Sequence, residues 1–134
     1  MILSGKTIKK LLDDKIIVVS PPAEVKEASI KIHFSDSFGK NRNELKPIKE
    51  YILKPKEFVV CLTKENITLP DNYAGLYDTH ISLSSVGVIT HMGSMLIEPG
   101  FSGQILLEIF NASDTDVILN KDARAGNLII TEIL

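Results

Sequence analysis

The sequence predicts an all-β fold, made mainly of strands with one short helix at the N-terminus. Short apolar segments with alternating polar and apolar residues recur along most of the chain, Gly, Pro, Asn and Asp turn signals separate them, and no helical pattern lies between them. Strands at this spacing are typical of a β-sandwich or barrel rather than a parallel βαβ sheet. The length of 134 residues predicts a single domain over residues 1–134.

The helix is expected directly after the first residues. Ser4 is a suitable N-cap, Ile8, Leu11 and Leu12 share one face at helical spacing, and "DDK" at residues 13–15 ends the segment. After the following "SPP" the pattern changes to strands, so this is the one helix that the sequence predicts.

Eight later segments have the composition and length of strands. They are "ASIKIHF" (28–34), "EFVVCL" (57–62), "YAGLYDTHISL" (73–83), "VGVIT" (86–90), "SMLIE" (94–98), "QILLEIF" (104–110), "DVILN" (116–120) and "NLIITEIL" (127–134). Segments 104–110 and 127–134 are apolar on both faces, which requires a second covering layer, and another copy of the chain is its simplest source. The polar stretch at 35–51 is expected to be a long loop, either a lid or, as its Lys and Asn content favours, a solvated excursion.

Composition narrows the classes of function. The chain is 44% hydrophobic and 24% charged, as in soluble globular proteins, and no apolar run is long enough to span a bilayer. A net charge of -2 argues against broad nucleic-acid binding, although a local basic site for a small anion remains compatible with it. The single cysteine excludes an internal disulfide framework, and the start of the chain lacks a signal-peptide core, so a cytoplasmic protein is expected.

The sequence lacks the residues that several kinds of reaction or binding site require. Zinc-dependent base deamination requires a Cys-x-x-Cys pair, whereas Cys61 stands alone in an apolar run and is expected to be a buried, inert thiol. His33, His80 and His91 lack the spacing of metal ligands, so no metal site is expected among the protein's own residues. Gly-rich phosphate loops are absent as well.

Glu108 is the residue that points to chemistry. With the period of two that a strand requires, Ile105, Leu107 and Ile109 face one side, while Glu108 lies on the other side among apolar neighbours. A carboxylate held among apolar side chains must be neutralised, paired, or given a raised pKa, which makes Glu108 a candidate general acid or base. The alternative is an edge strand with Glu108 in solvent or in an ordinary salt bridge.

Four segments resemble a known family in order and spacing. They are "MILSGKTI", "LKPKEFVVCLTKENITLP" (53–70), "IEPGFSGQILLEIFN" (97–111) and "ARAGNLII" (123–130). Together they resemble the dCTP deaminase branch of the dUTPase superfamily. The resemblance implies a distorted jelly-roll or β-clip fold, a homotrimer with active sites between subunits, and a deoxynucleoside triphosphate, dCTP or dUTP, bound with magnesium.

The resemblance also implies roles for individual residues. Glu108 falls on the glutamate that moves protons while water attacks C4 of cytosine, and Glu98 falls on the acid that orients the water in dUTPases. Phe101 and Gly103 match the turn that packs against the sugar and base. Asn127 stands where the dUTPases have a glutamine.

The departures from the family concern the phosphates. The family segment Gly-Arg-Ser-Ser-Leu-Ala-Arg corresponds to "THISLSS" at 79–85, where His80 and Ser85 replace the arginines, Ile81 replaces the first serine, and Ser82 is kept. Lys31 stands where an aspartate is usual, and the sequence ends without the family's nucleotide-closing tail. Lys31, Lys40 and Lys121 are the candidates for replacing some of that charge, each as a point charge rather than a planar fork.

Three interpretations remain open at this point. An active enzyme on dCTP or dUTP is favoured by the two retained glutamates. A trimeric nucleotide-binding or regulatory paralogue that has lost turnover is favoured by the changed phosphate segment. A purely structural β-trimer needs nothing from either glutamate beyond surface pairing.

Overall fold

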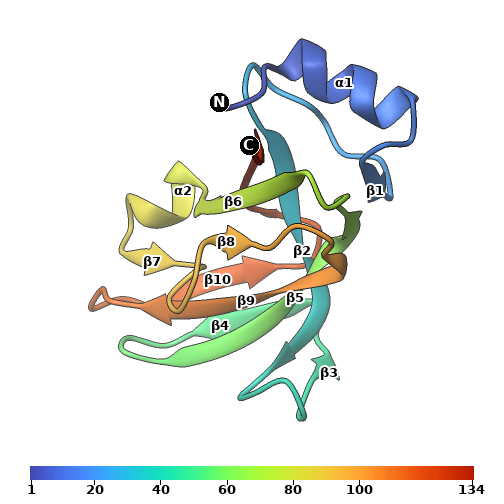
Figure 1. Ribbon diagram of the computed structural model, residues 1–134. Helices are drawn as coiled ribbons and strands as arrows, with labels where there is room; N and C mark the ends of the chain where they lie inside the picture. Colours follow the sequence, from blue (N-terminus) through green and yellow to red (C-terminus); the bar gives the residue numbers. More distant parts are fainter.

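The computed structural model describes all of residues 1–134 and is built mostly of β-strands (Figure 1). The helices are α1 (Gly5–Asp13) and α2 (Ile81–Ser84). The strands are β1 (Val18–Ser20), β2 (Ile30–Gly39), β3 (Lys46–Pro47), β4 (Glu50–Leu53), β5 (Phe58–Thr68), β6 (Tyr73–Thr79), β7 (Val88–Ile89), β8 (Leu96–Ile97), β9 (Ser102–Asn111), β10 (Val117–Asn120) and β11 (Arg124–Glu132).

One curled antiparallel sheet contains most of the strands. Its order is β7-β9-β5-β2-β11-β6-β8, with β1 added to β5 and β3 added to β2, and β10 pairs with β4 in a separate two-stranded sheet. The pairing register shifts in β2 between Phe34 and Phe38, and in β5 between Leu62 and Asn66. Such irregularities bend long strands, and Figure 1 shows β2 running from the α1 end to the opposite end of the molecule.

The N-terminal helix agrees with the prediction. Ser4 accepts a hydrogen bond from the Thr7 amide at 3.2 Å, and Ile8 and Leu11 are buried in the core. The Gly5 amide donates to Glu27 O at 2.6 Å, and a Cβ atom on Gly5 would lie 1.9 Å from Lys26 O. A glycine is therefore required where α1 begins against the backbone of Lys26 and Glu27, in the segment that leads into β2.

Two predictions about elements were wrong. The stretch 35–51 is not one long loop, because β2 continues to Gly39 and the segment also holds β3 and the start of β4, which leaves residues 40–45 as the connection. The segment 73–83 is not one strand either, because α2 follows β6. Both errors have a physical cause: edge strands meet water on one side and can be polar, and one helical turn is too short to show a helical period.

The alternation predicted for "QILLEIF" is confirmed in β9. Ile105, Leu107 and Ile109 are buried, whereas Glu108 is half-buried on the other face of the strand. The chain itself does not fully cover that second face. Large apolar side chains are also exposed along the segment from α2 to β8, which includes Ile81, Val86, Ile89, Met92, Met95 and Leu96.

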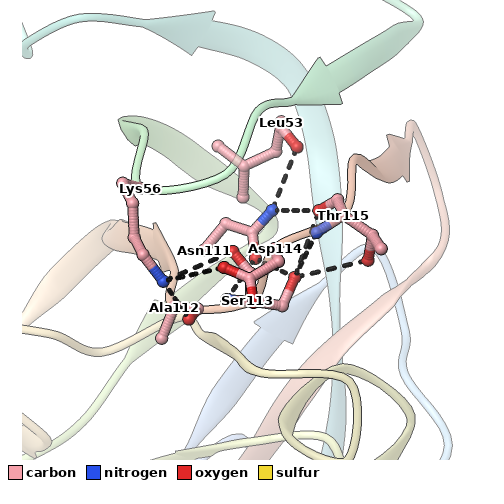
Figure 2. Close-up of polar contacts among 7 residues, drawn as sticks. All are labelled: Leu53, Lys56, Asn111, Ala112, Ser113, Asp114 and Thr115. Carbon is pink, nitrogen blue, oxygen red and sulfur yellow. Dashed lines mark hydrogen bonds and ion pairs between the residues drawn. The ribbon is translucent and has the colours of Figure 1, made fainter.

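A buried asparagine fixes the far end of β9 (Figure 2). The Asn111 amide nitrogen donates to Leu53 O at 3.2 Å and Thr115 O at 2.8 Å, and its oxygen accepts from the Ser113 amide at 2.9 Å. Lys56 closes the same turn by donating to Ala112 O at 2.6 Å. The position of β9, and with it the position of Glu108 three residues earlier, is therefore set by a satisfied polar network.

Candidate functional site

Glu108 lies on β9 beside the segment that leaves β7. Val60 of β5 is its cross-strand partner, and the Met92 amide donates to Glu108 O at 3.0 Å. A Cβ atom at Gly93 would lie 2.5 Å from Glu108 Oε1 and 2.9 Å from Oε2, so the carboxylate occupies the space that a side chain at this position would need. None of the ion pairs of the chain includes Glu108. The salt-bridge alternative therefore does not apply within one chain, and the carboxylate is left free to act on a ligand.

Glu98, Phe101 and Gly103 lie together at the opposite end of β9. Glu98 is exposed at the start of a turn that closes when the Phe101 amide donates to Glu98 O at 3.2 Å. Gly100 has a φ of +82° and Gly103 a φ of +139°, conformations that favour glycine and allow the sharp return into β9. Leu69 holds the turn by donating its amide to Phe101 O at 2.9 Å.

One chain does not bring the two glutamates together. Six residues of extended strand separate Ser102 from Glu108, which corresponds to roughly 20 Å. Ser82 and Asn127 belong to a third location, around α2 and β11. The residues proposed from the sequence therefore form separate groups within one chain.

His80 and α2 form the third location. The His80 amide donates to Ala125 O at 3.0 Å, which ties the start of α2 to β11, and the Leu83 side chain anchors the helix in the core. His80 Nδ1 accepts from the Ser82 amide at 3.3 Å and lies 2.7 Å from Ser82 Oγ. His80 thus serves as the N-cap of α2.

A cleft of about 450 Å³ opens beside α2, and we refer to it as the Arg124 cleft. It is lined by Lys26, Asp78, Thr79, His80, Ile81, Ser84, Arg124 and Asn127. Arg124 donates from Nη2 to Asn127 Oδ1, and Asn127 Nδ2 donates to Asp78 Oδ1 at 2.8 Å. Arg124 was not among the residues proposed from the sequence, because it is far from 79–85 along the chain and the pairing of β11 with β6 brings the two segments together.

The charges around the Arg124 cleft act on His80. Desolvation lowers the pKa of His80, and the positive charges of Arg124, Lys26 and Lys31 lower it further. Lys31 itself is bound to Glu24, with 2.5 Å between Nζ and Oε2, and this contact holds the pKa of the Glu24 carboxyl below its usual range. Among the candidate lysines, Lys31 acts on His80 beside the cleft but is already paired with Glu24.

A second cleft of about 440 Å³ adjoins the Arg124 cleft. It shares Asp78, Thr79 and Ser84 with the Arg124 cleft and is also lined by His91, whose Nδ1 lies 3.0 Å from Thr79 Oγ1. His91 also forms a β-bridge with Glu108. The second cleft thus includes a backbone neighbour of Glu108, although Glu108 itself lines neither cleft. A cavity of about 670 Å³ beside α1 is lined by neither glutamate and mixes lysines with acids.

A buried ionisable pair was missed by sequence reasoning. Glu65 is 2% exposed and accepts two hydrogen bonds from His33, one from the backbone amide at 2.9 Å and one involving Nδ1 at 2.6 Å. The strand expected at 57–62 ended before Glu65, whereas β5 continues to Thr68 and places Glu65 on its buried face. His33 is thus the partner of a buried carboxylate.

The residues of the chain do not fit a resident metal ion. No group of three or more His, Cys, Asp or Glu side chains lies close enough together to hold one. Cys61 is buried, and burial raises its pKa to about 12, so the thiol is not a nucleophile at neutral pH. No helix is long and apolar enough to cross a membrane.

A family model described as dCTP deaminase-like matches residues 40–133. The chain belongs to this dCTP deaminase-like family. A protein of Dictyoglomus turgidum named "dCTP deaminase, dUMP-forming" is 31% identical over 148 residues, covering 92% of this chain and 76% of that protein. The family that the sequence segments resembled is thereby confirmed.

Two groups of solved structures share the fold. The 2'-deoxycytidine 5'-triphosphate deaminase of Agrobacterium tumefaciens superposes with a TM-score of 0.81 at 14% identity, covering 98% of this chain and 48% of that one. The chain therefore spans about half the length of the Agrobacterium protein. A mutant dUTPase of Staphylococcus phage 80alpha, solved with dUpNHpp, superposes with a TM-score of 0.65 at 17% identity, covering 88% of this chain and 83% of that one. The all-β dUTPase-like fold predicted from the sequence is confirmed.

Proposed function

We propose that this protein is a dCTP deaminase that converts dCTP and water into dUTP and ammonia. The observation that carries the proposal is Glu108, a half-buried carboxylate without an ion-pair partner, held against Gly93 on an otherwise apolar strand face. Membership of the dCTP deaminase-like family supports the choice of reaction.

The proposed chemistry needs one group that moves protons. Glu108 takes a proton from the attacking water as oxygen bonds to C4 of cytosine, and it returns a proton as the C4–N bond breaks and ammonia leaves. Glu98 orients the attacking water, while Phe101 and Gly103 shape the turn against sugar and base. Ser82 and Asn127 contact the substrate from the α2 and β11 side.

A homotrimer brings these separate groups together in the proposal. The roughly 20 Å that separates Ser102 from Glu108 in one chain, and the exposed apolar side chains from α2 to β8, both support sites that form between subunits. The free thiol of Cys61 suits a reducing compartment, so we place the protein in the cytoplasm. Magnesium is proposed to arrive on the triphosphate, because the protein offers no ligand set of its own.

A second function is favoured by a specific observation. His80, Ile81 and Ser85 stand in the segment where the family keeps arginines and a serine for the phosphates. A trimeric nucleotide-binding or regulatory paralogue without turnover would tolerate these changes. It would bind dCTP or dUTP without converting either.

The deciding experiment is product chromatography after long incubation with dCTP and with dUTP, each with magnesium. Wild-type protein is expected to release dUTP or dUMP from dCTP, and Glu108→Gln, which keeps the shape but cannot take the proton, is expected to release neither. Formation of dUMP from dUTP would add a diphosphatase step to the same site. Binding of nucleotide without any product at high protein concentration would replace the proposal with the second function.

A further inference from the structure

The Arg124 cleft contains unpaired positive charge. Lys26 takes part in none of the ion pairs of the chain, and Arg124 is bound to the neutral amide of Asn127 rather than to a carboxylate. Asp78 is the one acid that lines the cleft, and its Oδ1 accepts from Asn127 Nδ2. With His80 neutral, the lining side chains have a net positive charge.

The guanidinium of Arg124 has donors left for a ligand. Its Nη2 is engaged by Asn127, but its Nε is buried and has no hydrogen-bond partner. Asn127 is the one hydrogen-bond partner of this guanidinium within the chain, so its terminal N–H groups remain available to a ligand that only accepts hydrogen bonds. A phosphate is such a ligand, and its oxygens match the planar fork of a guanidinium.

The backbone around the cleft keeps Arg124 in place. β11 pairs with β6 from Gly126 to Glu132, and its bulge next to β2 lies between Arg124 and Gly126. A Cβ atom on Gly126 would lie 2.1 Å from Asp78 O, so the two strands approach closely where the cleft begins. Arg124 itself pairs with His33 of β2, so it projects from the first residue of a paired strand.

We propose that the Arg124 cleft binds a phosphate group, with Arg124 as a multidentate donor and Lys26 as a second cation. The volume of about 450 Å³ exceeds that of one phosphate and accommodates a polyphosphate. Naming the ligand as a nucleoside triphosphate rests on the proposed function. In that case, Arg124 and Lys26 supply the charge that the segment 79–85 lacks.

The test is isothermal titration of the full chain with tripolyphosphate, without nucleotide or metal. Arg124→Gln is expected to weaken binding about 10- to 100-fold, the range for losing a charge-assisted hydrogen bond. Arg124→Lys is expected to recover part of the affinity. Arg42→Gln is the matched control, because Arg42 is the other arginine of the chain and is exposed in the 40–45 connection, so wild-type affinity is expected.

Each outcome decides the proposal. Equal affinities for Arg124→Gln and Arg42→Gln, or no binding by the wild-type protein, would overturn it, and circular dichroism of every variant verifies that the fold is intact. Turnover of dCTP, measured separately with Glu108→Gln as the inactive reference, reports on the proposed function. Tripolyphosphate binding that depends on Arg124, without dCTP turnover, would contradict the proposed deaminase activity and support the phosphate site. Turnover of dCTP together with wild-type tripolyphosphate affinity in Arg124→Gln would support the deaminase activity and contradict the phosphate site.

Discussion

At the scale of single residues, the Glu65–His33 pair shows how strongly one partner matters in the interior. Glu65 accepts both of its hydrogen bonds from His33, and no other side chain is bonded to its carboxylate. Its burial therefore depends on a single neighbouring residue. Removing that neighbour leaves a buried acid with only the backbone amide at position 33 as a donor.

The first prediction follows from this dependence. His33→Ala is expected to lower the free energy of unfolding by about 2–3 kcal/mol, because a hydrogen bond to a buried charged group is lost. Urea denaturation measures it. Lys64→Ala removes an exposed ion pair with Asp122 and is expected to cost less than about 1 kcal/mol. Equal losses in the two variants would contradict the assigned role of His33.

The second prediction concerns pH and His80. The lowered pKa of His80 means that, just below its usual value of 6.5, the folded chain binds fewer protons there than the unfolded chain. Acid therefore favours the unfolded state, and this part of the stability is present above about pH 6.5 and is lost as the pH falls through the lowered pKa.

His80→Asn keeps an N-cap for α2 and removes the titrating group. The melting temperature of wild type is expected to fall more steeply than that of His80→Asn between about pH 7.5 and about pH 5.5. Thermal melts of both proteins in one buffer series measure the difference. Parallel profiles would show that neither desolvation nor the charges of Arg124, Lys26 and Lys31 lower the pKa of His80.

The limits of sequence reasoning are visible at this scale. The strand face of Glu108 and the burial of Cys61 were predicted correctly, because strand alternation and an apolar sequence context determine these properties locally. Arg124 and Glu65 were not recognised, since their roles arise from cross-strand neighbours that the spacing of residues in the chain does not reveal. Contacts between residues that are far apart in the sequence cannot be identified from the spacing of residues in one chain.

At the scale of elements, β9 links the candidate site to the fold. It pairs with β5 over most of its length, and the Asn111 network in Figure 2 fixes its end. Long apolar strands of this kind are predictable because alternation over many residues is a strong signal. Two-residue edge strands such as β3 and the single turn of α2 carry too few residues for any period to appear.

The third prediction tests the end of β9. Asn111→Leu keeps the volume but leaves Leu53 O and Thr115 O without their donor, so the free energy of unfolding is expected to fall by roughly 2–4 kcal/mol. Asn120→Leu, at an exposed asparagine that ends β10, is the control and is expected to change stability by less than about 0.5 kcal/mol. Urea denaturation compares them, and similar midpoints would show that the network does not anchor the strand.

At the scale of the whole molecule, one chain leaves apolar surface that only another molecule can cover. The exposed apolar side chains between α2 and β8 adjoin the half-buried face of β9, where Ile89 pairs with Phe110. The same face carries Glu108. Assembly and completion of the candidate site are therefore expected to depend on the same surface.

The fourth prediction separates this surface from other exposed apolar groups. Ile89 is 36% exposed on β7, and Ile118 is 53% exposed on the separate two-stranded sheet, where it pairs with Ile52. Ile89→Glu would bury a charge between subunits and is expected to convert a trimer into monomers of 14.8 kDa. Ile118→Glu introduces the same charge outside the expected interface and is expected to leave the trimer intact.

Sedimentation velocity measures the masses, and dCTP turnover is measured on the same samples. If Ile89→Glu loses both the trimer and dCTP turnover while Ile118→Glu keeps both, the subunit interface lies at the candidate site. The reason is that a separated chain holds the turn of Glu98 and the strand position of Glu108 roughly 20 Å apart. A trimer that survives Ile89→Glu and dissociates with Ile118→Glu would move the interface to the β4–β10 sheet. The exposed surface from α2 to β8 would then need a different partner.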